Sequence, residues 1–136
     1  MTDKELVIEA INAMKNSYSP YSDFKVGAAL LTENNKVYTG CNIENVAFGP
    51  SICAERVAFF KAISEGEKSF SKIAVVGCKN GVITSPTPPC GVCRQVMREF
   101  CGDNFEILIV SENNEYEKVL LKELLPYSFK PEILSK

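Results

Sequence analysis

Histidine is absent from this 136-residue chain. Catalytic schemes that depend on an imidazole are therefore excluded, among them the Ser-His-Asp and Cys-His hydrolases. Any chemistry that the protein carries out must use cysteine, a carboxylate or a metal ion.

The chain also has no apolar run near the ~20 residues that a membrane helix needs, and no charged and then apolar leader at its N-terminus. We therefore expect a soluble, cytoplasmic protein with no membrane partner. The formal net charge is −2, and the basic residues are scattered along the sequence. This lack of a basic excess argues against nucleic acid as a partner and favours a small neutral substrate.

The hydrophobic content of the chain, 46% of its residues, is enough for one globular domain that covers residues 1–136. A chain of this length buries roughly two thirds of its unfolded surface, so it needs no disulfides to fold. In a reducing cytosol the six cysteines are expected to be thiols or metal ligands.

Periodicity and turn residues predict alternating helices and strands. The expected helices cover residues 3–15, 53–64, a segment that starts near 90, and a last turn at 122–125; the expected strands cover 24–31, 36–43, 73–76, 105–110 and 116–120. This order predicts an α/β fold with three layers, α/β/α, around one mixed sheet of about five strands.

Three cysteines and one glutamate have the spacing of a catalytic metal site. Cys90 and Cys93 are three residues apart, so in the first turn of a helix they share one face, and Cys53 begins another helix. If the two helices begin side by side, their N-terminal ends favour thiolate over thiol. Three ligands leave the fourth position of a zinc ion open, and Glu55 can reach that position as a general acid and base.

Three thiolates give the zinc centre a net negative charge and weaken it as a Lewis acid, so a cation is needed nearby. Arg56, three residues after Cys53, is the first candidate to donate hydrogen bonds to the sulfurs, and Arg94, next to Cys93, is the second.

The segments Cys-Ala-Glu-Arg at 53–56 and Pro-Cys-Gly-Val-Cys-Arg-Gln at 89–95 resemble the small tricysteine class of cytidine deaminases. Segments 24–30, 40–45 and 123–126 also resemble the family, in the same order. The likeness covers almost the whole chain and implies a cytidine deaminase-like fold with one Zn²⁺ per subunit.

The resemblance implies hydrolysis of cytidine and 2′-deoxycytidine to the uridine forms with release of ammonia, a step of pyrimidine salvage. Glu55 would carry protons to N3 of the ring and to the departing amino group. Asn42 and Glu44 match positions that hold a ribose hydroxyl, Phe24 matches the aromatic beside the base, and the backbone at Ala54 would contact the pyrimidine.

Family members are usually homotetramers in which neighbouring subunits complete each pocket. By this likeness Phe48 and Phe129 would serve the site of an adjacent subunit. Phe48 departs from the family pattern, in which tyrosine is often found, so one sugar contact through a hydroxyl is absent here.

Three alternatives stay open at this point. The Cys-x-x-Cys pair at Cys90 and Cys93 occurs in dithiol redox proteins, although the Trp-Cys-Gly-Pro-Cys context of such a site is missing. Zinc could instead serve a binding module, with Cys41, Cys78 or Cys101 as a fourth ligand. Within the deaminases, the substrate could be another cytosine compound such as blasticidin S, a polynucleotide or a free base.

Overall fold

A computed structural model describes residues 1–83 and 85–134 of the chain. One sheet carries five strands in the order β2-β1-β3-β4-β5. The strands are β1 (Phe24–Thr32), β2 (Val37–Cys41), β3 (Phe70–Lys79), β4 (Glu106–Val110) and β5 (Tyr116–Leu120). Neighbouring strands are antiparallel except β3 and β4, which are parallel. The mixed sheet predicted from the sequence is confirmed.

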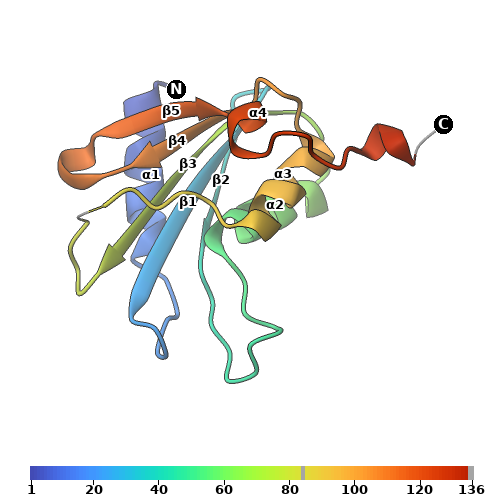
Figure 1. Cartoon of the computed structure of the whole chain (residues 1–136). Helices are drawn as coiled ribbons and strands as arrows, with labels where there is room; N and C mark the ends of the chain where they lie inside the picture. The colour runs from blue at the N-terminus through green and yellow to red at the C-terminus, as the bar shows by residue number, and fades with distance from the viewer. Residues whose placement is uncertain (84, 135–136) are drawn as a thin grey trace.

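Helices cover both faces of the sheet. Helix α1 (Asp3–Met14) lies on one face, while α2 (Ala54–Ser64) and α3 (Gly91–Phe100) lie side by side on the other (Figure 1). A short helix α4 (Leu121–Leu124) and the 3-10 turns η1 (Glu112–Asn114) and η2 (Pro131–Ile133) complete the described elements. The predicted three-layer α/β/α architecture is therefore confirmed.

Alternation along the strands explains why two helical layers form. Successive side chains of a strand point to opposite faces of a sheet. Ala29 and Leu31 of β1 accordingly belong to the core beneath α1, whereas Ala28 and Leu30 belong to the core beneath α2 and α3. Because both faces are apolar, both must be covered.

Two strands differ from the sequence prediction by more than one residue in length. Strand β3 was expected over residues 73–76 but extends over Phe70–Lys79. It is longer because pairing with β1 on one side and β4 on the other holds its polar residues and its glycine in the sheet. Strand β2 was expected to reach residue 43 and ends at Cys41. The N–H of Asn42 still bonds to the Val26 carbonyl, and beyond it Ile43 makes only isolated bridges, to Tyr18 and to Ile52.

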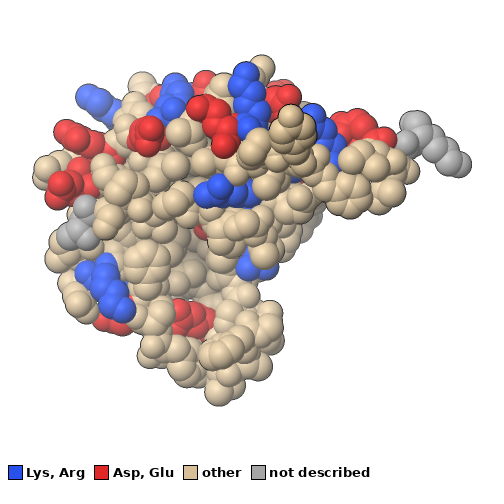
Figure 2. Space-filling model, in the orientation of Figure 1, with Lys and Arg blue, Asp and Glu red and all other residues tan. Residues whose placement is uncertain are grey.

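Figure 2 shows one face of the molecule with its charges. Acidic and basic side chains are intermixed along the upper edge of this face, and the hollow below is largely uncharged. This distribution agrees with the scattered charges expected from the sequence. None of the helices in the described residues is long and apolar enough to span a membrane.

Candidate active site

The N-terminal ends of α2 and α3 bring three thiols together. Cys53 is the N-cap of α2, Cys90 is the N-cap of α3, and Cys93 lies in the first turn of α3. The Sγ atoms of Cys53 and Cys90 are 3.7 Å apart, and those of Cys90 and Cys93 are 3.5 Å apart. All three sulfurs lie within 4.8 Å of one another, so the condition that the two helices begin side by side is met.

The donor set fits a zinc ion with three protein ligands. Tetrahedral coordination at Zn–S distances of ~2.3 Å places sulfurs about 3.8 Å apart, close to the observed separations, while a disulfide needs about 2.05 Å. Among the described residues no fourth cysteine or carboxylate joins the group. Cys78 instead belongs to the core beneath α1, and Cys101 packs against the opposite core. The structure therefore favours an open, three-ligand site over a four-cysteine structural one.

Hydrogen bonding concentrates negative charge on Cys53. A hydrogen bond from the Cys93 thiol, followed by one from Arg56, lowers the pKa of Cys53 to about 5 despite its partial burial. The same contact with Cys53, followed by burial, raises the pKa of Cys93. Such a cluster releases its remaining protons when it binds a metal ion, because the ligand form of cysteine is the thiolate.

Arg56 supplies the positive charge that the sequence predicted. Its Nη2 atom donates to Sγ of Cys53 at 3.6 Å, and its pKa is raised by this bond first and by Cys93 as a further partner. Arg56 follows Cys53 by three residues on the first turn of α2, which places both on one face of the helix.

Replacing Arg56 with glutamine should keep the fold and weaken the metal site. The glutamine amide can still donate a hydrogen bond, but it leaves the thiolate charge without a cation, so we expect zinc affinity or turnover to fall by about 10- to 100-fold. Competition with a chromogenic zinc chelator measures this change, and Lys68→Gln, at an exposed lysine, controls for loss of charge. Wild-type zinc affinity together with wild-type turnover would remove Arg56 from the metal site.

Glu55 is the buried acid beside the sulfurs. Its exposed fraction is 4%, and its Oε1 atom has no hydrogen-bond partner among the described residues. Burial raises the pKa of Glu55 to about 7, and the neighbouring Cys53 charge acts in the same direction. A carboxyl with a pKa near neutrality can both take up and release a proton, as general acid-base chemistry requires.

The metal-ligand set opens into a cavity of about 440 Å³ that Phe24, Asn42 and Glu44 also line. The side chain of Asn42 accepts a hydrogen bond from Val26 N–H at 2.9 Å and donates to the Phe24 carbonyl at 2.8 Å. Asn42 thereby fixes the beginning of β1, where the aromatic ring of Phe24 is placed.

Glu44 is held ionised at the other end of this cavity. It accepts hydrogen bonds from the N–H groups of Tyr21 and Ser22, at 3.0 and 3.2 Å, and from the Ser22 hydroxyl. The bond from the Ser22 hydroxyl is the largest cause of its lowered pKa. Glu44 is therefore a carboxylate that can accept further hydrogen bonds from hydroxyl groups.

The remaining predicted residues have different positions. Ala54, the first residue of α2, is fully buried beside Cys53. Arg94 donates to the carbonyls of Pro89, at 2.8 Å, and Leu124, at 2.7 Å, and so holds the chain that leads into Cys90. Phe48 and Phe129 are 86% and 56% exposed, and neither lines the cavity within this chain.

Sequence reasoning missed part of the cavity wall. The lining residues that it did not single out are Ser22, Val26, Ser51, Ile52, Thr87 and Pro88. Loop serines and prolines carry no periodic signal, so nothing in the pattern marked them. Gly77 is a further case: a Cβ there would lie 2.7 Å from Cζ of Phe24 and 2.5 Å from Oγ1 of Thr87, so only glycine leaves room for this pair as placed.

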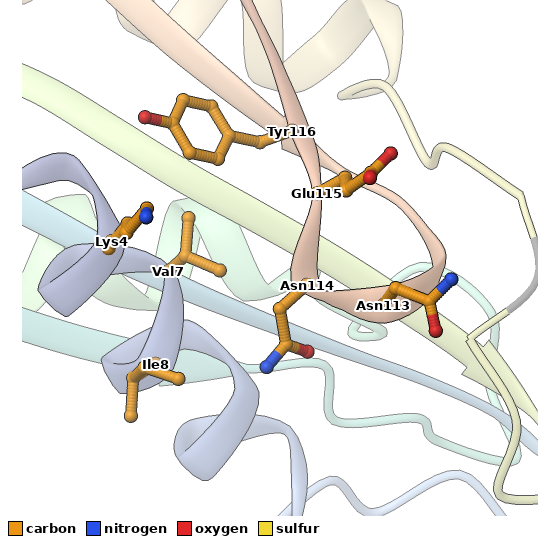
Figure 3. A pocket seen from close by; sticks show the side chains of 7 residues that line it. All are labelled: Lys4, Val7, Ile8, Asn113, Asn114, Glu115 and Tyr116. Carbon is orange, nitrogen blue, oxygen red and sulfur yellow. The ribbon is translucent and has the colours of Figure 1, made fainter.

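A second and larger cavity, of about 570 Å³, lies between α1 and the turn that joins β4 to β5 (Figure 3). Lys4, Val7 and Ile8 approach it from the helix, and residues 113–116 approach it from the turn and the start of β5. It contains no thiol and lies against α1, on the face of the sheet opposite α2 and α3. The metal-binding chemistry therefore belongs to the smaller cavity.

An α/β/α fold with three thiols at two helix N-termini and a buried glutamate beside them defines a zinc-dependent hydrolase of the deaminase class. The profile described as "Cytidine and deoxycytidylate deaminase zinc-binding region" matches residues 1–109. The chain belongs to this cytidine and deoxycytidylate deaminase family, and its cofactor is zinc.

Known proteins place the chain more narrowly among cytidine deaminases. It is 44% identical to the cytidine deaminase of Sporosarcina psychrophila, over 99% of this chain and 96% of the relative. The crystal structure of the cytidine deaminase from Burkholderia pseudomallei matches with a TM-score of 0.86 and 42% identity, over 95% of this chain and all of the other. A blasticidin-S deaminase of Bacillus cereus is only 30% identical, over 80% of this chain and 81% of the relative.

Gly40 sets the distance between β2 and the helix that follows Cys53. A Cβ at Gly40 would lie 2.4 Å from the carbonyl oxygen of Ala54 and 2.7 Å from the backbone nitrogen of Ala58. Both are backbone atoms of α2, so the helix itself would have to move. We expect Gly40→Ala to lower the free energy of unfolding by about 3 kcal/mol and to reduce the zinc bound per chain, measured by thermal unfolding and metal analysis.

Gly27 provides a matched control on the opposite face of the sheet. A Cβ there would lie 2.1 Å from the carbonyl oxygen of Ala10 in α1, so Gly27→Ala should destabilise the fold to a similar extent. Because α1 carries no metal ligand, folded Gly27→Ala protein should keep its zinc. Equal zinc loss in both variants would contradict a specific link between Gly40 and the site.

Proposed function

We propose that this protein is a cytoplasmic enzyme of pyrimidine salvage that hydrolyses cytidine and 2′-deoxycytidine to uridine and 2′-deoxyuridine, with release of ammonia. The whole chain, residues 1–136, would act as one zinc-dependent deaminase domain. The observation that carries this proposal is a buried glutamate, Glu55, next to three convergent thiols in a cavity that also holds Asn42 and Glu44. The cytidine deaminase relatives support the same substrate.

Cys53, Cys90 and Cys93 would hold the zinc ion, which, when bound, lowers the pKa of a coordinated water toward neutrality. Glu55 would manage the protons of the reaction. It takes one proton from the water that attacks C4, gives a proton to N3 of the ring, and assists the amino group to leave as ammonia. Its pKa of about 7 suits a group that must work in both directions.

The cavity wall would select a nucleoside. Phe24 offers an aromatic face for the cytosine ring, and the backbone at Ala54 lies next to the ligand Cys53. The Glu44 carboxylate and the Asn42 amide would bind ribose hydroxyls, and the hydrogen bonds that orient both groups support this role. A free base carries no ribose hydroxyls and would leave the remaining hydrogen-bonding capacity of these two groups unused.

Neighbouring subunits of a homotetramer would complete the pocket. Phe48 and Phe129 are large apolar side chains that are mostly exposed in the single chain. Exposed aromatic residues mark interaction surfaces when they gather in patches. We propose that both enter the pocket of an adjacent subunit, where Phe48 provides contact area without a hydroxyl.

An ultraviolet assay on purified zinc-loaded protein tests the function directly. Cytidine and 2′-deoxycytidine should be converted to the uridine forms, while cytosine and blasticidin S should react far more slowly. Protein refolded with a strong chelator should be inactive and should recover when zinc is added. Insulin reduction by metal-free protein, without deamination by the zinc form, would favour the dithiol alternative built on Cys90 and Cys93.

A further inference from the structure

A third cavity, of about 560 Å³, lies beside the C-terminal end of α3 and is separate from the thiol site. We call it the Arg98 cavity. Its polar lining residues are Arg98, Asp103, Lys122, Ser128 and Lys130, and Tyr127 also belongs to its wall. Three basic side chains therefore surround a single carboxylate.

Arg98 is the central group of this cavity. Only 4% of its side chain is exposed, and its Nη1 atom pairs with Asp103 at 2.9 Å. A guanidinium has five N–H donors in a planar fork, yet Nε of Arg98 has no hydrogen-bond partner among the described residues. A buried donor without a partner is costly, so a group that supplied an acceptor here would be favoured.

In the part of the chain that the structure describes, the other donor side chains that line the cavity also lack hydrogen-bond or ion-pair partners of their own. The hydroxyl of Ser128 is buried without a partner among the described residues. Lys130 lies 3.8 Å from Asp103, which is already paired with Arg98, and Lys122 makes no ion pair within the described part of the chain. Three basic side chains and one carboxylate therefore line the cavity, which leaves an excess of positive charge there.

We propose that the Arg98 cavity binds a phosphate group, either as the free anion or as part of a nucleotide. A phosphate provides several strong acceptor oxygens, and arginine forks with nearby lysines are the usual partners of such groups. Its negative charge would neutralise the excess from Lys122 and Lys130, and its oxygens would accept hydrogen bonds from these lysines and from the Arg98 guanidinium.

The position of the cavity connects it with the helix that carries two metal ligands. Gln95 of α3 donates to the Phe129 carbonyl at 2.9 Å, and Arg94 donates to the Leu124 carbonyl. The segment that forms the cavity is therefore fastened to the same helix that begins after Cys90. A bound phosphate would tighten this segment against α3 and raise the stability of the zinc-loaded protein.

Thermal unfolding of the zinc-loaded protein tests this proposal with inorganic phosphate as the probe. At 10 mM phosphate we expect the Tm to rise by about 5 °C relative to sodium chloride of equal ionic strength, as mass action gives for a Kd of about 1 mM. The double variant Lys122→Gln/Lys130→Gln should lose most of this rise. Both lysines are exposed, so the double variant is expected to fold.

Lys15→Gln/Lys68→Gln is the matched control, because it removes the same charge at two exposed lysines outside the cavity. It should respond to phosphate like the wild type. Phosphate also stabilises proteins through exclusion from their surfaces, and this effect is common to all three proteins. An equal rise in Tm for the three proteins, or no rise in any, would overturn the proposal. The readout is binding, so the result does not depend on deaminase activity.

Calorimetric titration separates the two sources of the phosphate group. Tyr127 is fully exposed beside the cavity, where its ring can stack on a base. If the ligand is a nucleotide, adenosine 5′-monophosphate should bind at least about tenfold more tightly than phosphate, and Tyr127→Asn should abolish that advantage. Asparagine is chosen because φ of Tyr127 is 50°, a left-handed conformation that asparagine accepts more readily than alanine. If adenosine 5′-monophosphate and phosphate bind with equal affinity, and the double lysine variant loses both, the ligand is the free phosphate anion.

Discussion

Glu55→Gln is expected to lower kcat for cytidine by about 10³-fold while the protein keeps its zinc, because glutamine fills the same space but cannot exchange a proton. The loss should fall on kcat more than on KM, since Glu55 contributes proton transfer in the transition state and Phe24, Asn42 and Glu44 line the rest of the cavity. Steady-state kinetics with metal analysis measures both quantities.

The same substitution should make the protein more stable. Glu55 is 4% exposed, and an ionised carboxylate at that position is costly. Its pKa is about 7 in the folded chain, whereas an unfolded glutamate titrates near pH 4.3. The folded state therefore binds more protons between these values, and wild-type stability falls as the pH rises through this window and is constant above it. The advantage of Glu55→Gln should be small near pH 4 and greatest above about pH 7.

Glu99→Gln is a suitable control, because Glu99 is an exposed acid on α3 that takes no part in the site. It should leave kcat, zinc content and the pH dependence of Tm unchanged. Turnover by Glu55→Gln within about tenfold of wild type would reject Glu55 as the proton carrier. Loss of zinc from Glu55→Gln would show that the carboxylate supports the metal rather than the proton transfer.

The parts of the fold that follow from local patterns were predictable. The first helix, expected over residues 3–15, is found at Asp3–Met14, and the helices that begin at Ala54 and Gly91 lie where Cys53 and Cys90 suggested. Spacing of three residues fixes Cys90 and Cys93 on one face of a helix. The convergence of Cys53 with this pair depends on how α2 and α3 pack on the sheet, so the sequence could offer it only as a condition.

Contacts between distant loops were not predictable from residue patterns. Glu44 is oriented by Ser22, and Asn42 by Val26 and Phe24, through hydrogen bonds that join segments about twenty residues apart. Such bonds depend on tertiary packing and leave no periodicity in the sequence. The resemblance to the deaminase family singled out Asn42 and Glu44. It did not show that both residues also hold the cavity wall in place.

Cys93→Ser should abolish zinc binding under conditions where the wild type is fully loaded. Cys93 is 1% exposed, and its sulfur lies 3.5 Å from that of Cys90. A serine hydroxyl stays protonated near neutral pH and is a poor zinc ligand beside two thiolates. Removing a residue that hydrogen-bonds to a metal ligand typically lowers metal affinity by about 10- to 100-fold. Loss of a ligand itself should therefore lower zinc affinity by more than about 100-fold. Chelator competition gives the affinity, and deaminase activity should disappear with the metal.

Zinc loss should also destabilise the fold, because the metal joins the beginnings of two helices. Cys53 belongs to α2, and Cys90 and Cys93 belong to α3, so the zinc-free protein loses a cross-link between segments far apart in sequence. Whatever binds only the folded state stabilises it by mass action. Wild-type protein treated with a chelator should therefore unfold at the same lowered temperature as Cys93→Ser, apart from the small packing cost of the substitution.

Cys101→Ser distinguishes a three-ligand site from a four-cysteine one. Burial raises the pKa of Cys101 to about 12, so its thiol is neutral and acts as a small apolar group packed against the core. The serine variant should lose some stability, as a buried hydroxyl does without a partner, yet bind zinc with wild-type affinity. Zinc release from Cys101→Ser, or full zinc retention by Cys93→Ser, would contradict the assigned ligand set. Retention by the first and release by the second would leave the fourth coordination position open for the water that the deamination consumes.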